Sequence, residues 1–267
     1  MNHLLRDIAP LDEATWALID DEASSRLKPA LGARRLVDVV GPLGWEHSAT
    51  DLGRATAVVD APQPSVTART RIVLPLAEVQ AAARLDREEL LAFSRGALDV
   101  DLGPLDDAAA AFAATENAAV LAGWSAVGIT GITAASPHTP LVHQGPAAQY
   151  ADVVSLGVAA LKRRGVDGPY GLAVGPAAWV DVIESSDSGY PIQPRLEQIL
   201  GGPVVWTPGI EGAVLVSLRG GDFLLELGQD VSVGYRAHDA TGVDLYLEES
   251  FSFRVATPEA AIAIRSV

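Results

Sequence analysis

Apolar residues recur at helical spacing in three parts of the chain. After Asp12, a favourable N-cap, a first helix is predicted that Pro29 is expected to end or kink. Its apolar face would hold Trp16, Ile19, Ala23 and Leu27. Pro104 suits the first turn of a long alanine-rich helix that stops near Gly123. A third helix is predicted over residues 147–164, directly before a glycine.

Residues 49–76 alternate in polarity and predict a long β-hairpin that turns at DAPQP. One face of its return arm carries Thr67, Arg69 and Arg71, and the other carries Val66, Ala68, Thr70 and Ile72. An arm of this length has too little core of its own to be stable alone. Two interpretations stay open: the arm folds onto its own domain, or another surface completes it.

The second half of the chain alternates short strands and short helices. Strands are predicted at Tyr170–Val174, Val204–Trp206, Ala213–Leu218, Phe223–Leu227 and Val231–Tyr235, with helices near residues 177–184 and 195–200. The last segment, VDLYLEESFSFRVATPEAAIAI, alternates strongly and predicts further strands. No repeat or linker divides the 267 residues, which are enough for a large core.

Composition excludes several classes of protein. The chain has no cysteine, which excludes disulfides and thiolate metal sites, and its formal charge is −15 with only two lysines, Lys28 and Lys162. A nucleic-acid partner is therefore not expected. The opening MNHLLRDIAPLDEATW lacks a signal-peptide pattern, and no apolar run is long enough to span a bilayer. These features predict a cytoplasmic protein without a membrane partner.

Catalytic motifs are missing from the sequence. There is no Walker phosphate loop and no dinucleotide G-x-G-x-x-G turn, and GWSAVG around Ser125 departs from the nucleophile elbow by one position. The five histidines form no metal-ligand pattern, and the loop ESSDSGY has no nearby histidine base. We expect no catalytic residues, no metal site and no enzymatic activity, which argues against a hydrolase.

Six segments together resemble the encapsulins, the shell proteins of bacterial nanocompartments, in the order found in that family. These segments are IAPLDEATWALID, GARRLVDVVGPLGWE, GVDGPYGLAV, SGYPI, RGGDFLLELGQDVSVGY and LYLEESFSFRV. They extend from about residue 4 to residue 256, so the resemblance covers essentially the whole chain.

The resemblance implies an α+β protein with the tailed-phage major capsid fold. Residues 1–48, 77–127 and 223–267 would form a peripheral domain, with the long helix as its spine, and residues 128–222 an axial domain. Residues 49–76 would be the extended loop, whose apolar face a neighbouring subunit completes. Such contacts would close into an icosahedral shell, which we expect to be a 60-mer.

The resemblance also implies a groove that captures the C-terminal peptide of a cargo protein, either a dye-decolourising peroxidase or a ferritin-like iron-oxidising protein. Arg34 and Asp38 would be its polar clamps. The candidate apolar walls are Leu27, Leu31, Val231, Val233, Phe251 and Phe253. The alternative is that Arg34 and Asp38 form an intrachain ion pair that only stabilises the fold.

A five-fold pore is the remaining implied site. The loop that would line it holds Ser185, Ser186, Asp187, Ser188, Gly189 and Tyr190, and a ring of acids there would favour cations. The alternative is a solvated loop that does not control flux. Some shells of the family carry flavin, but Arg84 and Arg87 offer no aromatic platform, so no cofactor is predicted.

A phage or prophage capsid protein that packages DNA is the main competing interpretation. It would share the fold, but the scarcity of lysine argues against a wall that faces a genome.

Overall fold

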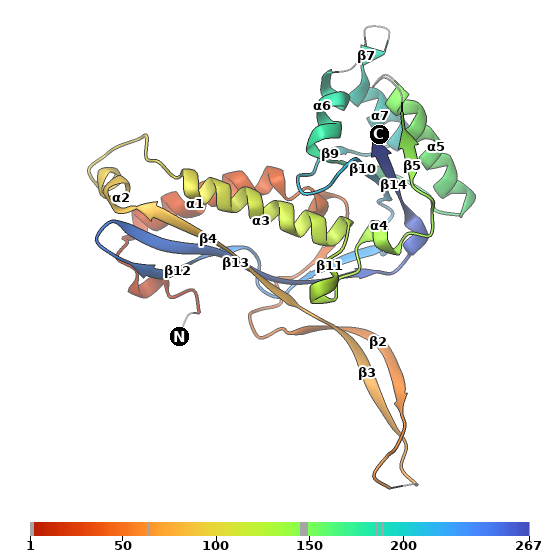
Figure 1. Cartoon of the computed structure of the whole chain (residues 1–267), viewed down its shortest axis with the longest axis horizontal. Helices are drawn as coiled ribbons and strands as arrows, with labels where there is room; N and C mark the ends of the chain where they lie inside the picture. Colours follow the sequence, from red (N-terminus) through yellow and green to blue (C-terminus); the bar gives the residue numbers. More distant parts are fainter. Residues whose placement is uncertain (1–2, 64, 145–148, 185, 188–189, 267) are drawn as a thin grey trace.

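The computed structural model describes residues 3–63, 65–144, 149–184, 186–187 and 190–266. Its helices are α1 (Glu13–Ala30), α2 (Arg87–Ser94), α3 (Gly103–Leu121), α4 (Ile132–Ala135), α5 (Tyr150–Arg163), α6 (Pro176–Glu184) and α7 (Ile192–Leu200), with short 3-10 turns that include η2 (Ala33–Arg35). The two main sheets lie at different places along the molecule, and a hairpin projects away from both (Figure 1).

The first sheet is built around one long strand, β13 (Gly242–Val255). Its order is β1 (Asp38–Val40), β11 (Phe223–Leu227), β13 and β12 (Ser232–His238), and β4 (Ala77–Asp86) also pairs with β13. Helices α1 and α3 lie over this sheet (Figure 1). Strand β4 pairs with β13 along its whole length, although its sequence is polar and alanine-rich, and α3 packs against the same strand.

The second sheet has the order β5 (Leu141–His143), β14 (Ala261–Ser266), β10 (Ala213–Ser217), β6 (Tyr170–Val174) and β9 (Val204–Trp206). Strand β14 therefore pairs with the segment 128–222, whereas the sequence grouped it with residues 223–255. Ile262 and Ile264 of this strand are buried in the core of the second sheet, where β14 pairs with β10 and β5.

Helical predictions hold with small changes at the ends. Helix α1 begins after Asp12, whose carboxylate accepts a hydrogen bond from the Thr15 N–H at 2.8 Å. Pro29 lies inside its last turn without ending it there, because the Leu31 N–H still reaches the Leu27 carbonyl at 2.9 Å. Helix α2 was not predicted, although Asp86 caps it by accepting from the Glu88 N–H.

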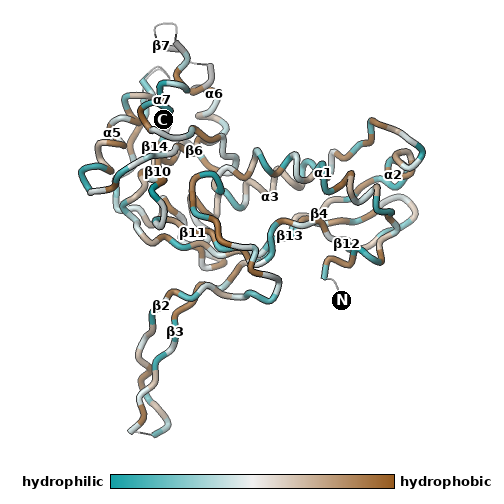
Figure 2. Tube along the Cα trace, turned by 180° about the vertical axis from the view of Figure 1, so that it is seen from behind, coloured by the Kyte–Doolittle hydropathy of each residue, from teal (hydrophilic) through white to brown (hydrophobic). Residues whose placement is uncertain are grey.

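The predicted hairpin is formed by β2 (Ala49–Val58) and β3 (Ala68–Pro75). Only its base touches the body, and hydrophobic positions recur along the isolated arm (Figures 1 and 2). Val58, Val59, Val66 and Val73 are 43%, 80%, 54% and 44% exposed. The arm is therefore not folded onto its own domain, and its apolar side chains face solvent in the single chain.

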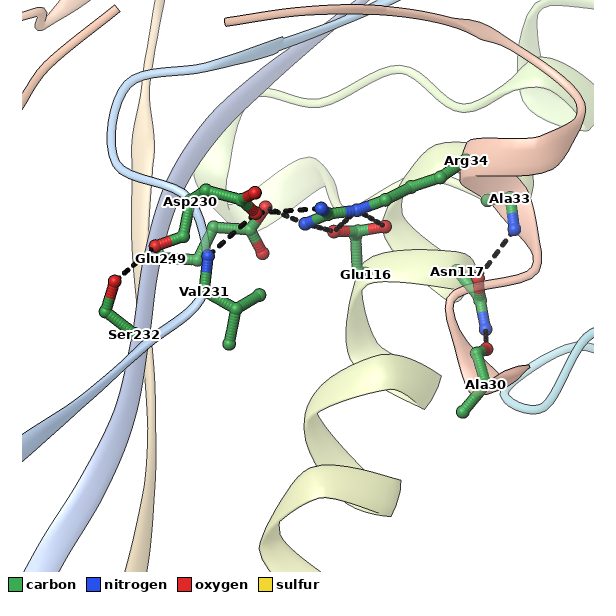
Figure 3. A network of polar contacts seen from close by, with 9 residues as sticks. All are labelled: Ala30, Ala33, Arg34, Glu116, Asn117, Asp230, Val231, Ser232 and Glu249. Atoms are coloured by element: carbon green, nitrogen blue, oxygen red, sulfur yellow. Dashed lines mark hydrogen bonds and ion pairs between the residues drawn. The ribbon is translucent and has the colours of Figure 1, made fainter. Parts of the chain in front are cut away.

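A buried ion-pair network joins four segments where α3 and η2 meet the first sheet (Figure 3). The Arg34 guanidinium, which follows α1 in η2, donates to Glu116 of α3 at 2.6 Å, to Glu249 of β13 at 2.6 Å and to Asp230 at 2.8 Å. Glu116 and Glu249 are almost completely buried, whereas the Asp230 side chain is 46% exposed. One cation thus holds three carboxylates from three different parts of the chain.

Burial and the neighbouring Glu116 charge raise the pKa of Glu249 well above its ordinary value. Burial works against the charge of Arg34, but hydrogen bonds and charges from Glu116 and Glu249 still raise the pKa of Arg34 above its usual range. Glu249 therefore binds a proton more tightly in the folded subunit than in the unfolded chain, which relieves the excess of negative charge in the network.

Replacing Arg34 by Met should lower the free energy of unfolding by about 3–5 kcal/mol, because two buried carboxylates lose their counter-charge. Denaturant titration of the purified protein measures this loss. Arg35→Met is the matched control, since the neighbouring Arg35 is exposed. Equal losses in the two variants would show that the network does not support the fold.

Because the folded subunit holds the Glu249 proton more tightly, the free energy of unfolding should fall as the pH rises above about 4.3, the ordinary pKa of a glutamate. Glu249→Gln keeps an oxygen for Arg34 but cannot ionise, so its stability profile should be flatter over that range. Thermal unfolding followed across pH tests this, with Glu211→Gln on the exposed surface as control. A slope unchanged from wild type would contradict the raised pKa.

Candidate functional site

A groove lies between α1 and β12. It encloses about 410 Å³. Helical spacing places Ala23 and Leu27 on the same side of α1, and Leu31 follows directly after the helix. Val233 of β12 and Val231 of the preceding loop line the groove opposite them. Its full lining is Leu4, Arg6, Asp20, Ala23, Ser24, Leu27, Lys28, Leu31, Arg34, Asp230, Val231, Ser232, Val233 and Leu247. The floor is therefore apolar and continuous with the core.

Strand β12 lies at the edge of its sheet and can accept a further strand. One backbone group on this edge already has a partner, because the Tyr235 N–H donates a hydrogen bond to the Leu4 carbonyl at 2.9 Å. Residues two apart in a strand direct their backbone groups to the same side, so Val233 presents its N–H and C=O to the same edge. The groove thus offers backbone hydrogen bonds beside its apolar floor.

Charged pairs frame the groove. Arg6 and Asp20 form an ion pair at 2.6 Å, and the Arg6 guanidinium stacks 4.0 Å from the centre of the Trp16 ring. Elsewhere in the lining, Arg34 is held by Asp230 at 2.8 Å. The Asp230 carboxylate also accepts from the Val231 N–H at 2.8 Å, which fixes the turn that carries the groove wall (Figure 3).

Five of the predicted groove residues line this groove: Leu27, Leu31, Arg34, Val231 and Val233. Leu27, Leu31 and Val233 are buried in its floor, whereas Val231 is half-buried. The Arg34 guanidinium donates its hydrogen bonds to the buried carboxylates of Glu116 and Glu249 and is therefore not free to bind a peptide.

Asp38, Phe251 and Phe253 lie outside this groove. Asp38 starts β1 and accepts a hydrogen bond from the Gly221 N–H at 2.6 Å, so it forms no pair with Arg34. Phe251 is fully buried in the core. Phe253 lines a separate hollow near the base of the hairpin. The physical reason is that β1 leaves α1 toward β11, which carries Asp38 away from the groove.

Sequence reasoning missed several polar residues of the groove, namely Asp20, Ser24, Lys28, Asp230 and Ser232. Helical periodicity could have found the first three, because Asp20 and Ser24 lie one turn apart and Lys28 one turn further on. No sequence pattern marked Asp230 and Ser232 as groove residues, because Asp and Ser are common in turns whatever their function.

The predicted pore loop is described only in part. Ser186–Asp187 form β7, which pairs with β8 (Tyr190–Pro191). Ser185, Ser188 and Gly189 lie outside the described residues. The short β7–β8 hairpin lies at the far end of the second sheet (Figure 1).

No group of three or more His, Asp or Glu side chains is placed to hold a metal ion among the residues that the structure describes. Within the same ranges, no helix combines the length and apolarity that a membrane crossing requires.

The chain is similar to known shell proteins along its whole length. The family described as "Encapsulating protein for peroxidase" matches residues 1–252. A type 1 encapsulin shell protein of Rhodospirillum rubrum is 44% identical, covering 100% of this chain and 98% of the relative. Those of Brevibacterium linens and Mycobacterium tuberculosis are each 39% identical and cover 99% of this chain and 99% of the relative.

Solved structures share the fold at low sequence identity. A virus-like particle from Pyrococcus furiosus matches with a TM-score of 0.61 at 13% identity, over 94% of this chain and 98% of that chain. A structure from Mycobacterium phage Bobi matches with a TM-score of 0.54 at 15% identity, over 90% of this chain and 91% of that chain. The chain has the tailed-phage capsid fold, and it belongs to the type 1 encapsulin shell protein family.

Proposed function

We propose that this chain is the subunit of a closed icosahedral shell of 60 copies in the cytoplasm, which encloses a cargo enzyme. The observation that carries the proposal is the hairpin, because its apolar side chains stay exposed beyond the body of the subunit. Exposed apolar surface of this kind is stabilised when a second copy covers it. Membership of a family of shell proteins supports the same assembly.

The groove beside β12 is the proposed site for the C-terminal peptide of the cargo. An extended peptide could add to the β12 edge at Val233 and place alternate side chains against Leu27 and Leu31. Arg34 would then act by holding Asp230 and the groove wall in position rather than by gripping the peptide. The family description names a peroxidase, which makes a dye-decolourising peroxidase the first candidate cargo, with a ferritin-like protein as the second.

The β7–β8 loop is the proposed lining of a five-fold pore. An acid at Asp187, repeated around a symmetry axis, would favour cations over anions. A solvated loop without influence on flux is the alternative for this segment.

A DNA-packaging capsid is the second candidate function, because the fold is shared with phage capsids. The formal charge of −15 argues against it, since a wall that faces DNA has to neutralise phosphates. Nuclease-protected DNA inside purified particles would favour the capsid, and empty or protein-filled particles the nanocompartment.

Changing Val59 and Val66 to Ser should prevent closed particles while the subunit still folds. Each valine gains about 1.5–3 kcal/mol when it is fully buried, and a shell repeats that gain at every contact. Electron microscopy and size-exclusion chromatography measure assembly. Thr56→Ser with Thr70→Ser is the control on the same arm. Normal particles from the valine variant would show that the hairpin is not an intersubunit element.

Filling the groove should abolish cargo loading without affecting assembly. Ser24→Trp places an indole in the groove, whereas Ser25→Trp places it on the exposed side of the same helix. The reporter is a fluorescent protein fused to the C-terminal tail of the candidate cargo, a dye-decolourising peroxidase or a ferritin-like protein. We expect at least tenfold less reporter in Ser24→Trp particles than in Ser25→Trp particles. Equal loading would place the peptide elsewhere.

A further inference from the structure

The start of the chain crosses one end of the groove. The Leu4 carbonyl accepts a hydrogen bond from the Tyr235 N–H of β12 at 2.9 Å, and the Leu4 side chain is buried in the groove lining. Two residues later, Arg6 donates to both carboxylate oxygens of Asp20 on α1, at 2.6 and 3.2 Å. Residues 3–6, the N-terminal strap, therefore bridge the two walls of the groove, β12 on one side and α1 on the other.

The strap is held in place by contacts of its own. The His3 ring stacks on the Trp45 ring, with 3.9 Å between the ring centres and 11° between the planes. The Nε2 atom of His3 also lies 3.2 Å from the carboxylate of Glu248, whose side chain is almost completely buried. Leu5 has a left-handed backbone conformation, with φ of 54°, which turns the chain toward α1. A leucine keeps such a conformation only where its surroundings fix it, so the strap is a defined element of the fold.

A second charged bridge closes the other end of the groove. There the Arg34 guanidinium, which follows α1, donates to Asp230 at 2.8 Å, and Asp230 precedes β12. The same Asp230 carboxylate accepts from the Val231 N–H at 2.8 Å. The backbone donors two residues before and two residues after Val233 are thus already bound, the first by Asp230 and the second by Leu4. Val233 is the place between them where a further strand can pair.

The spacing of the two bridges limits the length of peptide that fits. At a rise of about 1.5 Å per residue, Asp20 lies roughly 15 Å from the end of α1 at Ala30. An extended chain rises about 3.3 Å per residue, so about five residues cover this length. A peptide that moved along β12 by two residues would present the same face to the groove, but one of its ends would then meet the strap or the Arg34 bridge.

We propose that the N-terminal strap is the stop that sets the register of the cargo peptide in the groove. The peptide pairs with β12 at Val233, because the strap occupies Tyr235 and closes the groove beyond it. Apolar contacts alone do not choose one register, since a slip of two residues keeps the same side chains facing the floor. The inference rests on the proposed cargo groove and names what fixes the position of the peptide within it.

Disulfide trapping tests the register, because the chain has no cysteine of its own. Ser24→Cys places one thiol in the groove. The reporter is a cysteine-free fluorescent protein fused to the tail of the candidate cargo, with a single cysteine introduced at successive tail positions. With the strap intact, one tail position should give at least tenfold more disulfide than the positions two residues to either side, because a disulfide forms only over a short Cα–Cα distance.

Loosening the strap should broaden this pattern. In His3→Gly with Leu4→Gly, tail positions two residues apart should give disulfide yields within about threefold of each other, because the peptide can then slip along β12. Trp45→Ala, which removes only the ring beneath His3, should broaden the pattern in the same direction. Asp7→Gly with Ile8→Gly is the matched control, since both residues are exposed and directly follow the strap. Electron microscopy and thermal unfolding establish that each variant assembles and folds.

The outcomes separate the two proposals. A reporter that loads into particles with the strap intact but forms no disulfide with Ser24→Cys at any tail position would overturn the proposed groove. A single register that persists in His3→Gly with Leu4→Gly, or several registers with the strap intact, would overturn only the role of the strap. Assembled particles of that double variant with at least tenfold less reporter would overturn it as well, because the strap would then supply affinity instead of register.

Discussion

The structure depends on the placement of one guanidinium among three carboxylates. Arg34 connects the end of α1, the spine helix α3, the long strand β13 and the turn before β12. A buried charge pair contributes little net stability, since the desolvation of its members offsets their attraction. Its larger effect is geometric, because every other arrangement of these four segments would leave a charge buried without a partner. The groove lies between two of the segments fixed in this way, so its shape depends on the network.

A second polar residue secures the same junction. Asn117, one position after Glu116 in α3, accepts from the Ala33 N–H at 2.9 Å and donates to the Ala30 and Pro208 carbonyls at 2.8 and 2.9 Å. The chain passes so close to another segment here that a Cβ at Gly32 would lie 2.6 Å from the Trp206 carbonyl oxygen. Only glycine fits such an approach. The end of α1 is thereby fixed against both the spine helix and the second sheet.

The residues that stabilise the folded body and the exposed residues of the hairpin lie in different parts of the molecule. Its two cores and the Arg34 network lie within the body, which holds the buried apolar residues. The hairpin contributes almost nothing to these cores, and its valines are exposed to solvent in the single chain. The charges of the Arg34 network lie where α1, α3, β13 and the turn before β12 meet.

The sequence by itself determined much of this protein. Local signals gave the Asp12 cap, the alanine-rich spine helix, the hairpin and the short strands of the second half, because each depends on neighbours close in sequence. The order of six segments identified the family.

Tertiary structure alone decided that Arg34 binds Glu116 and Glu249, 82 and 215 residues away, rather than Asp38. It also decided that β14 joins the second sheet and that Phe251 and Phe253 lie outside the groove. Such contacts join residues far apart in the chain, so they depend on how whole elements pack, which no local pattern of residues records.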